Sequence, residues 1–498
     1  MALRKILGME TEFGIFHRRA GDSNPIAASS VLINAYINSL GRSGTASPLP
    51  RVGWDFVDET PANDARGLSL LSAMAPEVET HLVNAVLTNG ARYYVDHAHP
   101  EVSTPECRTA LDALLFDRAA EEIVRASMAS VARRLGVDAE LICHKNNSDG
   151  KGNSYGTHEN YLVARSVPFA RIVHQITPHF VSRQVVVGAG KVGCELPGVA
   201  PGSVPFQLSQ RADFFEEEVG LETTLKRPIV NPRDEPHCDP SLYRRLHVIV
   251  GDANMSESAT LLKVGATAIV LAMIEDDELG DDLELAQPVA SIVRVSHDPT
   301  LATTIPLRDG RRMTALDLQW SLYERARRYQ ERVGLEAVGH SVGELVLDLW
   351  QAVLDGLTNN PESVGHLVDW VAKRRLVQGY AERHQLRPDD ARLKAIDLQY
   401  HDMRAERCLA HRVGLARIVD PVDVQLAMTT PPDDTRAYFR GRCIAKWPSA
   451  IASANWDSIM FDTGRDPLQR VPMMEPLRGT AALVGPLIDR SDTPLDLL

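Results

Sequence analysis

The stretch that decides the fold of this chain is residues 89–101, NGARYYVDHAHPE. It opens with Asn-Gly, a strong turn signal, and continues into aromatic and β-branched residues that predict a strand. Because successive side chains of a strand point to opposite faces, Arg92, Tyr94 and Asp96 share one face, and Tyr93 and Val95 share the other. One face is therefore polar, and the other is expected to pack against the core. Taken alone, this pattern is more typical of an antiparallel strand with a solvated face.

A second stretch, residues 6–15 (ILGMETEFGI), has the same alternation. It places Glu10 and Glu12 on one face, with Leu7 and Met9 on the other. Two carboxylates this close repel each other unless a proton or a cation lies between them. Oxygen ligands suit Mg²⁺, which also binds the phosphate oxygens of nucleotides. A Glu-x-Glu strand is by itself more often a solvated edge, so the metal site depends on further strands of this kind.

Residues 157–163 (THENYLV) predict a third strand. If Tyr161 and Val163 face the core, His158 and Asn160 face the site, which favours His158 as a metal or nucleotide contact. A lone histidine on a strand is still more often structural.

Two more segments extend the pattern, residues 205–215 and 244–252, and the second places His247 across the pleat from its apolar neighbours. Between them lies a cationic run, residues 226–237 (KRPIVNPRDEPH). Arginine is the residue for bidentate recognition of carboxylate or phosphate. Several antiparallel strands thus share one polar, charged face, which a single strand could not establish.

Helical periodicity covers residues 109–135, and amphipathic helices near residues 315–332, 342–357 and 361–382 are expected to cover the apolar side of the sheet. The most apolar helix candidate, residues 259–274, contains Lys263 and is interpreted as a buried helix too short to span a bilayer. The expected fold class is α+β, with one large antiparallel sheet backed by helices.

The composition changes twice along the chain. Residues 41–79 are rich in Gly, Ser, Pro, Asp and Ala, which indicates a long loop with Trp54 and Phe56 as its anchors; a functional lid and a tolerated surface insertion fit it equally well. After about residue 419 a helix at 435–440 and a strand at 454–461 indicate a small second domain. We therefore expect a large catalytic domain at 1–420 and a small one at 421–498.

Charge and cysteine usage restrict the function. The formal net charge is -13, from 53 Lys and Arg against 66 Asp and Glu, which argues against a general nucleic-acid binder. The six cysteines form no CxxC pair, so neither a zinc site nor a disulfide framework is indicated. A cytoplasmic protein with no membrane association is expected, since residues 1–5 lead into a strand-like segment without a long apolar stretch.

Many ordered motifs together resemble the Pup ligase/deamidase family. They are residues 8–14 (GMETEFG), 89–96 (NGARYYVD), 99–101 (HPE), 145–147 (KNN), 158–161 (HENY), 233–237 (RDEPH), 244–247 (RRLH) and 435–437 (TRA). The resemblance implies a glutamine synthetase-like fold, in which a curved antiparallel sheet with a polar catalytic face is backed by helices and followed by a small C-terminal domain.

The family has a ligase branch, which attaches the disordered protein Pup to lysines, and a deamidase/depupylase branch, which acts on Pup. Residues 96–101 (DHAHPE) and 149–152 (DGKG) resemble the deamidase branch, as does the loop at 41–79. Residues 10–13 (ETEF) are closer to the sequence motif of the ligase branch. The deamidase branch is the better match.

The resemblance also implies roles for individual residues. Asp96 would be the catalytic carboxylate. The candidate Mg²⁺ ligands are Glu10, Glu12, Tyr94, Glu101, His158 and His247. The candidate ATP contacts are Arg92, Thr104, Trp456, Arg436 and Arg440. Candidate contacts for the acidic Pup are Arg211, Arg227 and Arg233, although phosphate contacts fit these three equally well.

The implied reaction is ATP- and Mg²⁺-dependent amide hydrolysis: deamidation of the C-terminal Gln of Pup to Glu, and cleavage of the isopeptide in pupylated proteins, with a functional link to the bacterial proteasome. ATP is expected to organise the site without being consumed at each turnover. The alternatives are a Pup–protein ligase, a small-molecule glutamate–amine ligase, and a noncatalytic Pup-binding scaffold. The intact Asp96 and Glu10/Glu12 pair disfavour the scaffold.

Overall fold

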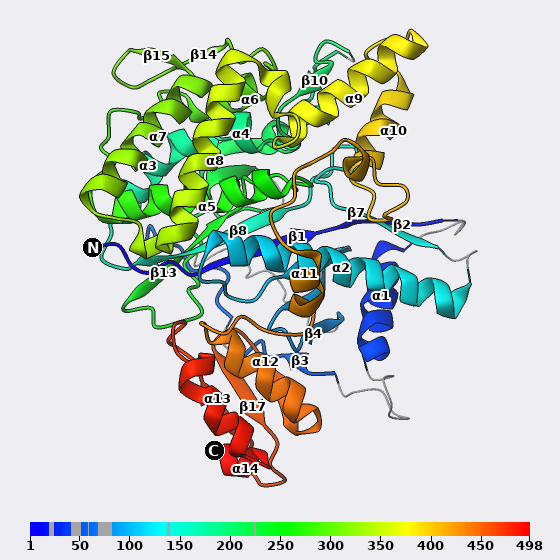
Figure 1. The fold of residues 1–498 in the computed structure, drawn as a ribbon, viewed down its shortest axis with the longest axis vertical. Helices are drawn as coiled ribbons and strands as arrows, with labels where there is room; N and C mark the ends of the chain where they lie inside the picture. Colours follow the sequence, from blue (N-terminus) through cyan, green and yellow to red (C-terminus); the bar gives the residue numbers. More distant parts are fainter. Residues whose placement is uncertain are drawn as a thin grey trace.

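A ten-stranded sheet runs through the molecule (Figure 1). The computed structural model describes residues 1–18, 24–40, 51–57, 59–67, 82–136, 140–200, 202–223 and 226–498. The sheet order is β13 (Tyr243–Val248), β8 (Thr157–Ala164), β1 (Leu7–Glu12), β6 (His99–Ser103), β5 (Arg92–Asp96), β4 (Asn84–Val86), β3 (Gly53–Trp54), β16 (Ile451–Ala454), β17 (Ser458–Phe461) and β18 (Gln469–Pro472). All neighbours pair antiparallel except β3 and β16, which are parallel. The expected α+β class with a helix-backed sheet is confirmed.

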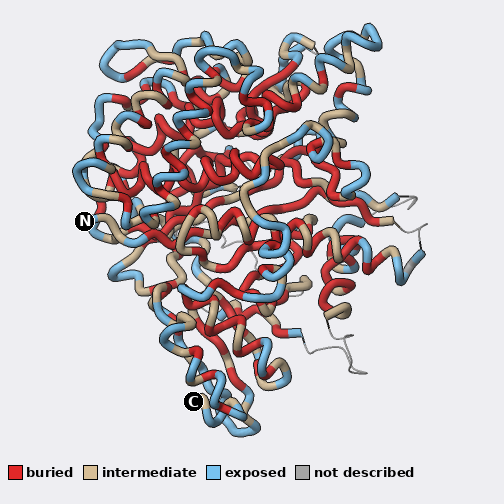
Figure 2. The backbone as a smooth tube through the Cα atoms, viewed as in Figure 1, coloured by how far each residue is buried: buried red, intermediate tan, exposed pale blue. Residues whose placement is uncertain are grey.

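Helices bury the apolar face of this sheet. Leu7 and Met9 of β1 and Tyr161 of β8 belong to the main core, together with apolar side chains of α2 (Ala110–Leu135) and α5 (Glu257–Glu275). Around α5 pack α3 (Phe169–Ser182), α7 (Ala315–Arg332) and α8 (His340–Asn359). Figure 2 shows the buried chain concentrated in this helical layer and in the strands beneath it. The polar face is thus the one left for chemistry.

The most apolar helix, α5, is a core helix. By length and composition its 19 residues are enough to cross a membrane, so the expectation that it is too short was wrong. Residues 257–274 of this helix are buried within the protein, as expected, and Lys263 donates to the backbone carbonyl of Asp252 over 2.7 Å.

The strand expected at residues 6–15 is two strands in different sheets. The chain leaves the main ladder at Phe13, and β2 (Gly14–His17) pairs instead with β7 (Leu141–His144). Phe13 packs in a second core cluster, beneath β5 and α1 (Pro25–Leu40). A Cβ on Gly14 would lie 2.5 Å from the Tyr155 hydroxyl, so the bend needs a glycine. Alternation alone did not reveal this change of sheet.

Three other expected elements were wrong in extent. Residues 205–215 form β10 (Phe206–Gln207), paired with β9 (Lys191–Val192), then η2 (Ala212–Phe214) and the first residue of β11 (Phe215–Val219), all outside the main sheet. The helix expected at 361–382 divides into η4 (Pro361–Val364) and α9 (Asp369–His384). The strand expected at 454–461 divides into β16 and β17, because residues 455–457 form the turn between them.

The remaining elements are short connections and peripheral pieces. They are α4 (Gln184–Val187), β11 (Phe215–Val219), β12 (Arg227–Val230), α6 (Pro288–Ser296), β14 (Thr304–Pro306), β15 (Arg312–Thr314), η3 (Glu336–Val338), α10 (Ala391–Tyr400), η5 (Ala410–Arg412), α11 (Pro421–Ala427), α12 (Ala437–Lys446), η6 (Pro448–Ala450), α13 (Ala481–Arg490) and α14 (Pro494–Leu497).

The C-terminal segment has a core of its own but shares the sheet. Side chains of α12, β16, β17 and α13 pack together with Val52, Trp54 and Val86 of the preceding region. Phe56 packs against the same cluster, so Trp54 and Phe56 anchor the part of the 41–79 loop that is described; residues 41–50, 58 and 68–79 of that loop lie outside the described residues. Ala427 of α11 packs in the main core, and the division expected between residues 420 and 421 stays a prediction.

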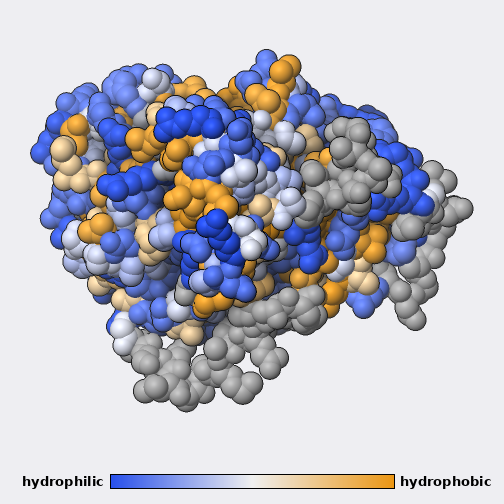
Figure 3. All heavy atoms as spheres, turned by 90° about the horizontal axis from the view of Figure 1, so that it is seen from below, coloured by the Kyte–Doolittle hydropathy of each residue, from blue (hydrophilic) through white to orange (hydrophobic). Residues whose placement is uncertain are grey.

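Figure 3 views the molecule from the end that carries the C-terminal segment in Figure 1. Hydrophobic residues reach this surface in groups between hydrophilic ones. Exposed large side chains of the C-terminal segment include Leu483 and Leu495.

Candidate active site

Strand register brings the polar side chains of five strands onto one face. Glu10 of β1 lies opposite His158 of β8 on one side and Ser103 of β6 on the other. Further along the sheet, Glu101 of β6 lies between Glu12 of β1 and Tyr94 of β5. Opposed residues in neighbouring strands share a face, so the alternation predicted for these strands places their polar residues together.

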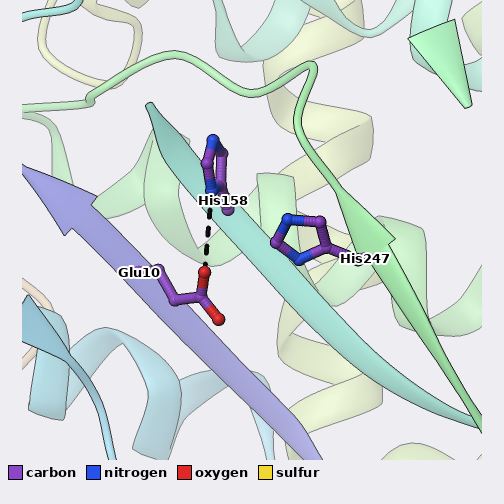
Figure 4. A group of neighbouring side chains, drawn as sticks. All are labelled: Glu10, His158 and His247. Carbon is purple, nitrogen blue, oxygen red and sulfur yellow. Dashed lines mark ion pairs between the residues drawn. The ribbon is translucent and has the colours of Figure 1, made fainter. Parts of the chain in front are cut away.

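The first cluster consists of Glu10, His158 and His247, whose ligand atoms lie within 4.8 Å of one another (Figure 4). The Glu10 carboxylate lies 3.6 Å from Nδ1 of His158, and the two imidazole rings are 5.0 Å apart and nearly perpendicular. Asn160 donates to Glu10 over 2.9 Å, and its amide oxygen lies 3.0 Å from Nδ1 of His247. The expected orientation of His158 and Asn160 toward the site is confirmed.

The electrostatics of this cluster favour a cation. Burial raises the pKa of Glu10, but the hydrogen bond with His158 and the nearby His247 and Arg245 outweigh it and hold that pKa well below its ordinary value. Burial lowers the pKa of His247 well below the usual imidazole value, so this ring is neutral and has a free lone pair for a metal.

The second cluster consists of Glu12, Asp96 and Glu101, again with ligand atoms within 4.8 Å. Glu12 is held by Nδ1 of His99 at 3.0 Å and by the backbone N–H of Gly156 at 2.6 Å. Burial raises the pKa of Glu101 well above its ordinary value, and the negative charges of Asp96 and Glu12 raise it further. Three carboxyl groups this close need a cation or a shared proton.

Asp96 is the solvent-accessible carboxylate of this cluster. Its side chain is 39% exposed, whereas that of Glu12 is 10% exposed. It ends β5, where residues 97 and 98 turn the chain into β6, and His97 contacts its carboxylate over 2.8 Å. Burial raises the pKa of Asp96, but the hydrogen bond and charge of His97 outweigh it, so that the pKa lies below its ordinary value. An ionised, accessible carboxylate therefore faces the polar surface.

Tyr94 lies on the same face, opposite Glu101. Burial raises the pKa of its phenol well above the ordinary value, and the Glu101 charge adds to this, so the group is neutral. The phenol oxygen accepts a long hydrogen bond of 3.4 Å from Ser103. Its role as a metal ligand stays a prediction.

An aromatic–arginine stack borders the two clusters. The Arg92 guanidinium lies 4.1 Å from the Trp54 ring and 3.9 Å from the Tyr94 ring, and Trp54 meets Trp456 edge-on at 5.1 Å. Thr104, buried nearby, accepts a hydrogen bond from the backbone N–H of Met9. Such a stack presents one positive charge and flat apolar rings, which are groups that suit phosphate and a base.

One cavity adjoins this stack at Trp456, and a second cavity adjoins the first. The first, a small one of about 80 Å³, is lined in part by Glu10, Thr104 and Trp456. It shares Pro236 and His237 with a wider cleft of about 810 Å³, lined mainly by residues 60–67, 234–240 and 457–474. The cleft has room for a nucleotide or for a peptide segment.

Arg245 is a site residue that the sequence interpretation did not single out. It donates to Asn160 over 2.8 Å and lies 3.7 Å from the Glu10 carboxylate. The signal was its position two residues before His247, since residues i and i+2 of a strand share a face.

Arg436 and Arg440, expected at the nucleotide, are buried in ion pairs with Glu106. Arg436 Nε donates to Glu106 over 2.7 Å, and Arg440 donates to the same carboxylate and to the backbone carbonyl of Gly90. Burial raises the pKa of Glu106, but the charges of Arg440 and Arg436 outweigh it and lower that pKa to about 2. The two arginines join α12 to the turn before β5; a nucleotide contact by either stays a prediction.

The three arginines expected to meet Pup lie in two places. Arg211 is 1% exposed and donates to the backbone carbonyl of Ile249, and Arg227 donates to the carbonyl of Ser154 over 2.8 Å. Both are beside the 149–152 loop. Burial and the neighbouring Arg227 lower the pKa of Arg211 to about 10. Arg233 lies apart, among Arg245, Glu235 and Glu10.

Fold and site together define an enzyme whose active site lies on the open polar face of a large antiparallel sheet. The family model described as Pup-ligase protein matches residues 5–460, and the chain belongs to this family. The resemblance found in the motifs is thus confirmed.

Named relatives and solved structures agree. The chain is 50% identical to the depupylase of Acidothermus cellulolyticus, covering 100% of this chain and 99% of the relative. It is 45% identical to the Pup deamidase/depupylase of Mycolicibacterium smegmatis over 100% and 99%. It is 41% identical to the Pup–protein ligase of Acidimicrobium ferrooxidans over 79% and 86%. The ligase PafA in complex with Pup superposes with a TM-score of 0.80 at 32% identity, covering 98% of this chain and 91% of PafA.

Proposed function

We propose that this protein is an amidase that acts on Pup, deamidating its C-terminal Gln to Glu and cleaving the Pup–lysine isopeptide of pupylated proteins. The observation that carries the proposal is the placement of Asp96: an ionised, accessible carboxylate at the end of β5, beside the buried Glu12 and Glu101. The names of the relatives at 45–50% identity support hydrolysis over ligation.

Nucleotide binding is part of the proposal. The Pup ligase PafA with bound ADP superposes with a TM-score of 0.73 at 36% identity, covering 82% of this chain. In this chain the nucleotide would lie at the stack of Arg92, Trp54 and Trp456. ATP is redundant for hydrolysis of an amide, so we expect it to organise the site rather than to be consumed at each turnover.

The two clusters fit Mg²⁺ bound with a nucleotide. One carboxylate and two imidazoles lie within reach of one cation in the first cluster, and three carboxyl groups do so in the second. Burial and the neighbouring carboxylates raise the pKa of Glu101, and a bound cation would offset both effects. Glu10, His158 and His247 would hold one ion, and Glu12 and Glu101 another. When bound, the ions supply positive charge that binds phosphate oxygens and polarises a carbonyl.

The residues of the chain perform the remaining steps. Asp96 either attacks the amide carbon, releasing ammonia or the lysine amine and leaving an anhydride that water opens, or takes a proton from the attacking water. Its low pKa keeps it ionised for either role. His97 holds the carboxylate in place. Arg227, beside the 149–152 loop, would contact the carboxylates of Pup. A cytoplasmic location and a functional link to the bacterial proteasome would follow from Pup as the substrate.

The test uses the purified protein, Mg²⁺, ATP and Pup ending in Gln, with the mass of Pup followed over time. We expect the small mass increase of amide-to-acid conversion with the wild type and with the exposed control Asp309→Asn, but not with Asp96→Asn. No conversion, combined with attachment of Pup ending in Glu to a lysine, would mean that the chain is a ligase. Turnover of free glutamate without Pup would indicate a small-molecule ligase.

A further inference from the structure

A third group of ligand atoms lies outside the active site, beside η2 and the end of α6. Cys194, Asp213 and His297 come from three separate segments, and their ligand atoms lie within 4.8 Å of one another. Nε2 of His297 is 2.7 Å from Oδ1 of Asp213 and 3.8 Å from Sγ of Cys194. Sequence motifs do not indicate this group, since no CxxC pair is present and the three residues are far apart in the chain.

The arrangement is that of a metal site rather than of a nucleophilic triad. In a triad the nucleophile and the carboxylate contact opposite nitrogens of the histidine ring. Here the sulfur and the carboxylate both face the same nitrogen, Nε2, so that three ligand atoms converge on one point. Tetrahedral zinc places its sulfur and nitrogen ligands roughly 3.5 Å apart and its nitrogen and oxygen ligands about 3.4 Å apart. The histidine–aspartate contact of 2.7 Å has to open and the sulfur–nitrogen distance of 3.8 Å has to shorten, each by less than about 1 Å.

The surroundings orient the ligands. The second carboxylate oxygen of Asp213 accepts from the backbone N–H of Glu195 and from Nε2 of Gln207, both over 2.8 Å, which leaves Oδ1 for the cluster. The Cys194 sulfur accepts the N–H of Leu196 at 3.3 Å, a contact that suits a thiolate. Partners of this kind fix ligands at metal centres. The Asp213 side chain is 1% exposed and that of His297 18%, so one side remains open for water.

We propose that Cys194, Asp213 and His297 bind a Zn²⁺ ion, with water as the fourth ligand. Sulfur, imidazole and a single carboxylate oxygen are the donors that zinc prefers, and they differ from the oxygen-rich donors of the active site. The ion ties the segment after β9 to η2 and α6.

The site is linked to the loop that distinguishes the deamidase branch. Glu195, next to Cys194, accepts from the backbone N–H of Gly152 over 3.0 Å and from the Ser148 hydroxyl. Zinc at this place holds residue 195, and through it the 149–152 loop beside Arg227. The ion is therefore structural and acts on substrate binding from a distance.

The experiment uses the full-length protein, freed of metal by a chelator and then titrated with Co²⁺ in excess Mg²⁺. Cobalt bound to a thiolate has a sulfur-to-metal charge-transfer absorption, which the cysteine-free clusters of the active site do not produce. We expect this band at one equivalent in the wild type and in the control Cys238→Ser, and its loss in Cys194→Ser. Competition with Zn²⁺ should show zinc affinity at least about 100-fold weaker in His297→Ala.

Two outcomes would overturn the proposal: no thiolate band in the wild type, or a band that survives Cys194→Ser. Cys194→Ser is nearly isosteric, so we expect it to retain the fold. Circular dichroism and nucleotide binding check that it does. Gln207→Leu, which removes one partner of Asp213 and no ligand, provides a second measurement and should weaken zinc by about 10-fold or more.

Discussion

Glu101 of β6 lies directly opposite Glu12 of β1, and, counted over backbone and side chain together, the two residues are only 2% and 7% exposed. Burial is the main cause of the raised pKa of Glu101, and Asp96 and Glu12 add to it. The folded protein therefore retains a proton that the unfolded chain releases, so the free energy of unfolding falls as pH rises from the unfolded pKa toward the folded one. A like-charged pair in this position lowers the stability of the metal-free protein.

We predict that Glu101→Gln stabilises the metal-free protein at neutral pH and removes this fall in stability. Each unit of pKa elevation corresponds to about 1.4 kcal/mol. Urea denaturation in the presence of a chelator, repeated across a pH series, measures the free energy of unfolding. Glu122→Gln, on the half-exposed side of α2, is the control. A less stable Glu101→Gln variant would contradict the argument.

Mg²⁺ binding should release a proton from the same carboxyl, because a cation favours the ionised form. Calorimetric titration in buffers of different ionisation enthalpy counts the released protons. We expect about one proton in the wild type near neutral pH and fewer in Glu101→Gln. Equal release by both proteins would place the proton elsewhere.

Asp96→Asn should reduce Pup deamidation by at least about 10²- to 10⁴-fold while leaving ADP affinity within about twofold. Its two possible roles can be separated by single turnover in ¹⁸O-labelled water. Label in the Asp96 carboxylate would show that it is the nucleophile, because a base toward water gains no oxygen; the base role predicts label in the product alone.

Glu106→Gln should destabilise the protein by about 3–5 kcal/mol, since it leaves two buried arginines without their shared partner. The folded pKa of Glu106, about 2, lies below its unfolded value, so the stabilisation is present above the unfolded pKa and is lost as pH falls toward 2. The exposed pair of Arg442 and Asp489 is the control, and Asp489→Asn should change little. A similarly small effect of Glu106→Gln would show that the buried pairs do not hold α12 in place.

Arg227→Glu should weaken Pup binding by about 10-fold or more and leave ADP affinity unchanged, because a reversed charge beside the 149–152 loop repels an acidic peptide. Arg211 is less suitable for this test, since it is 1% exposed against 9% for Arg227 and donates to the backbone carbonyl of Ile249, so reversal of its charge would disturb the fold more. Fluorescence anisotropy with labelled Pup measures the effect, with the exposed Arg308→Glu as control. Equal losses for Pup and ADP would assign Arg227 to the nucleotide.

The sequence by itself determined which side chains share a face within each strand. Arg92, Tyr94 and Asp96 alternate with Tyr93 and Val95, and the structure buries the latter two in a core cluster as expected. This follows from a local rule, the two-residue repeat of a strand. The motifs were equally readable, and the family that they indicated was confirmed.

Only the tertiary structure decided which strands are neighbours and which distant residues meet. Register between β1 and β6 sets Glu12 against Glu101, and the change of sheet at Phe13 ends that ladder. Glu106 meets Arg440 across 334 residues of chain, and Cys194 meets His297 across 103. Local periodicity carries no information on such pairs, because they depend on how separate elements pack and pair once the core has formed.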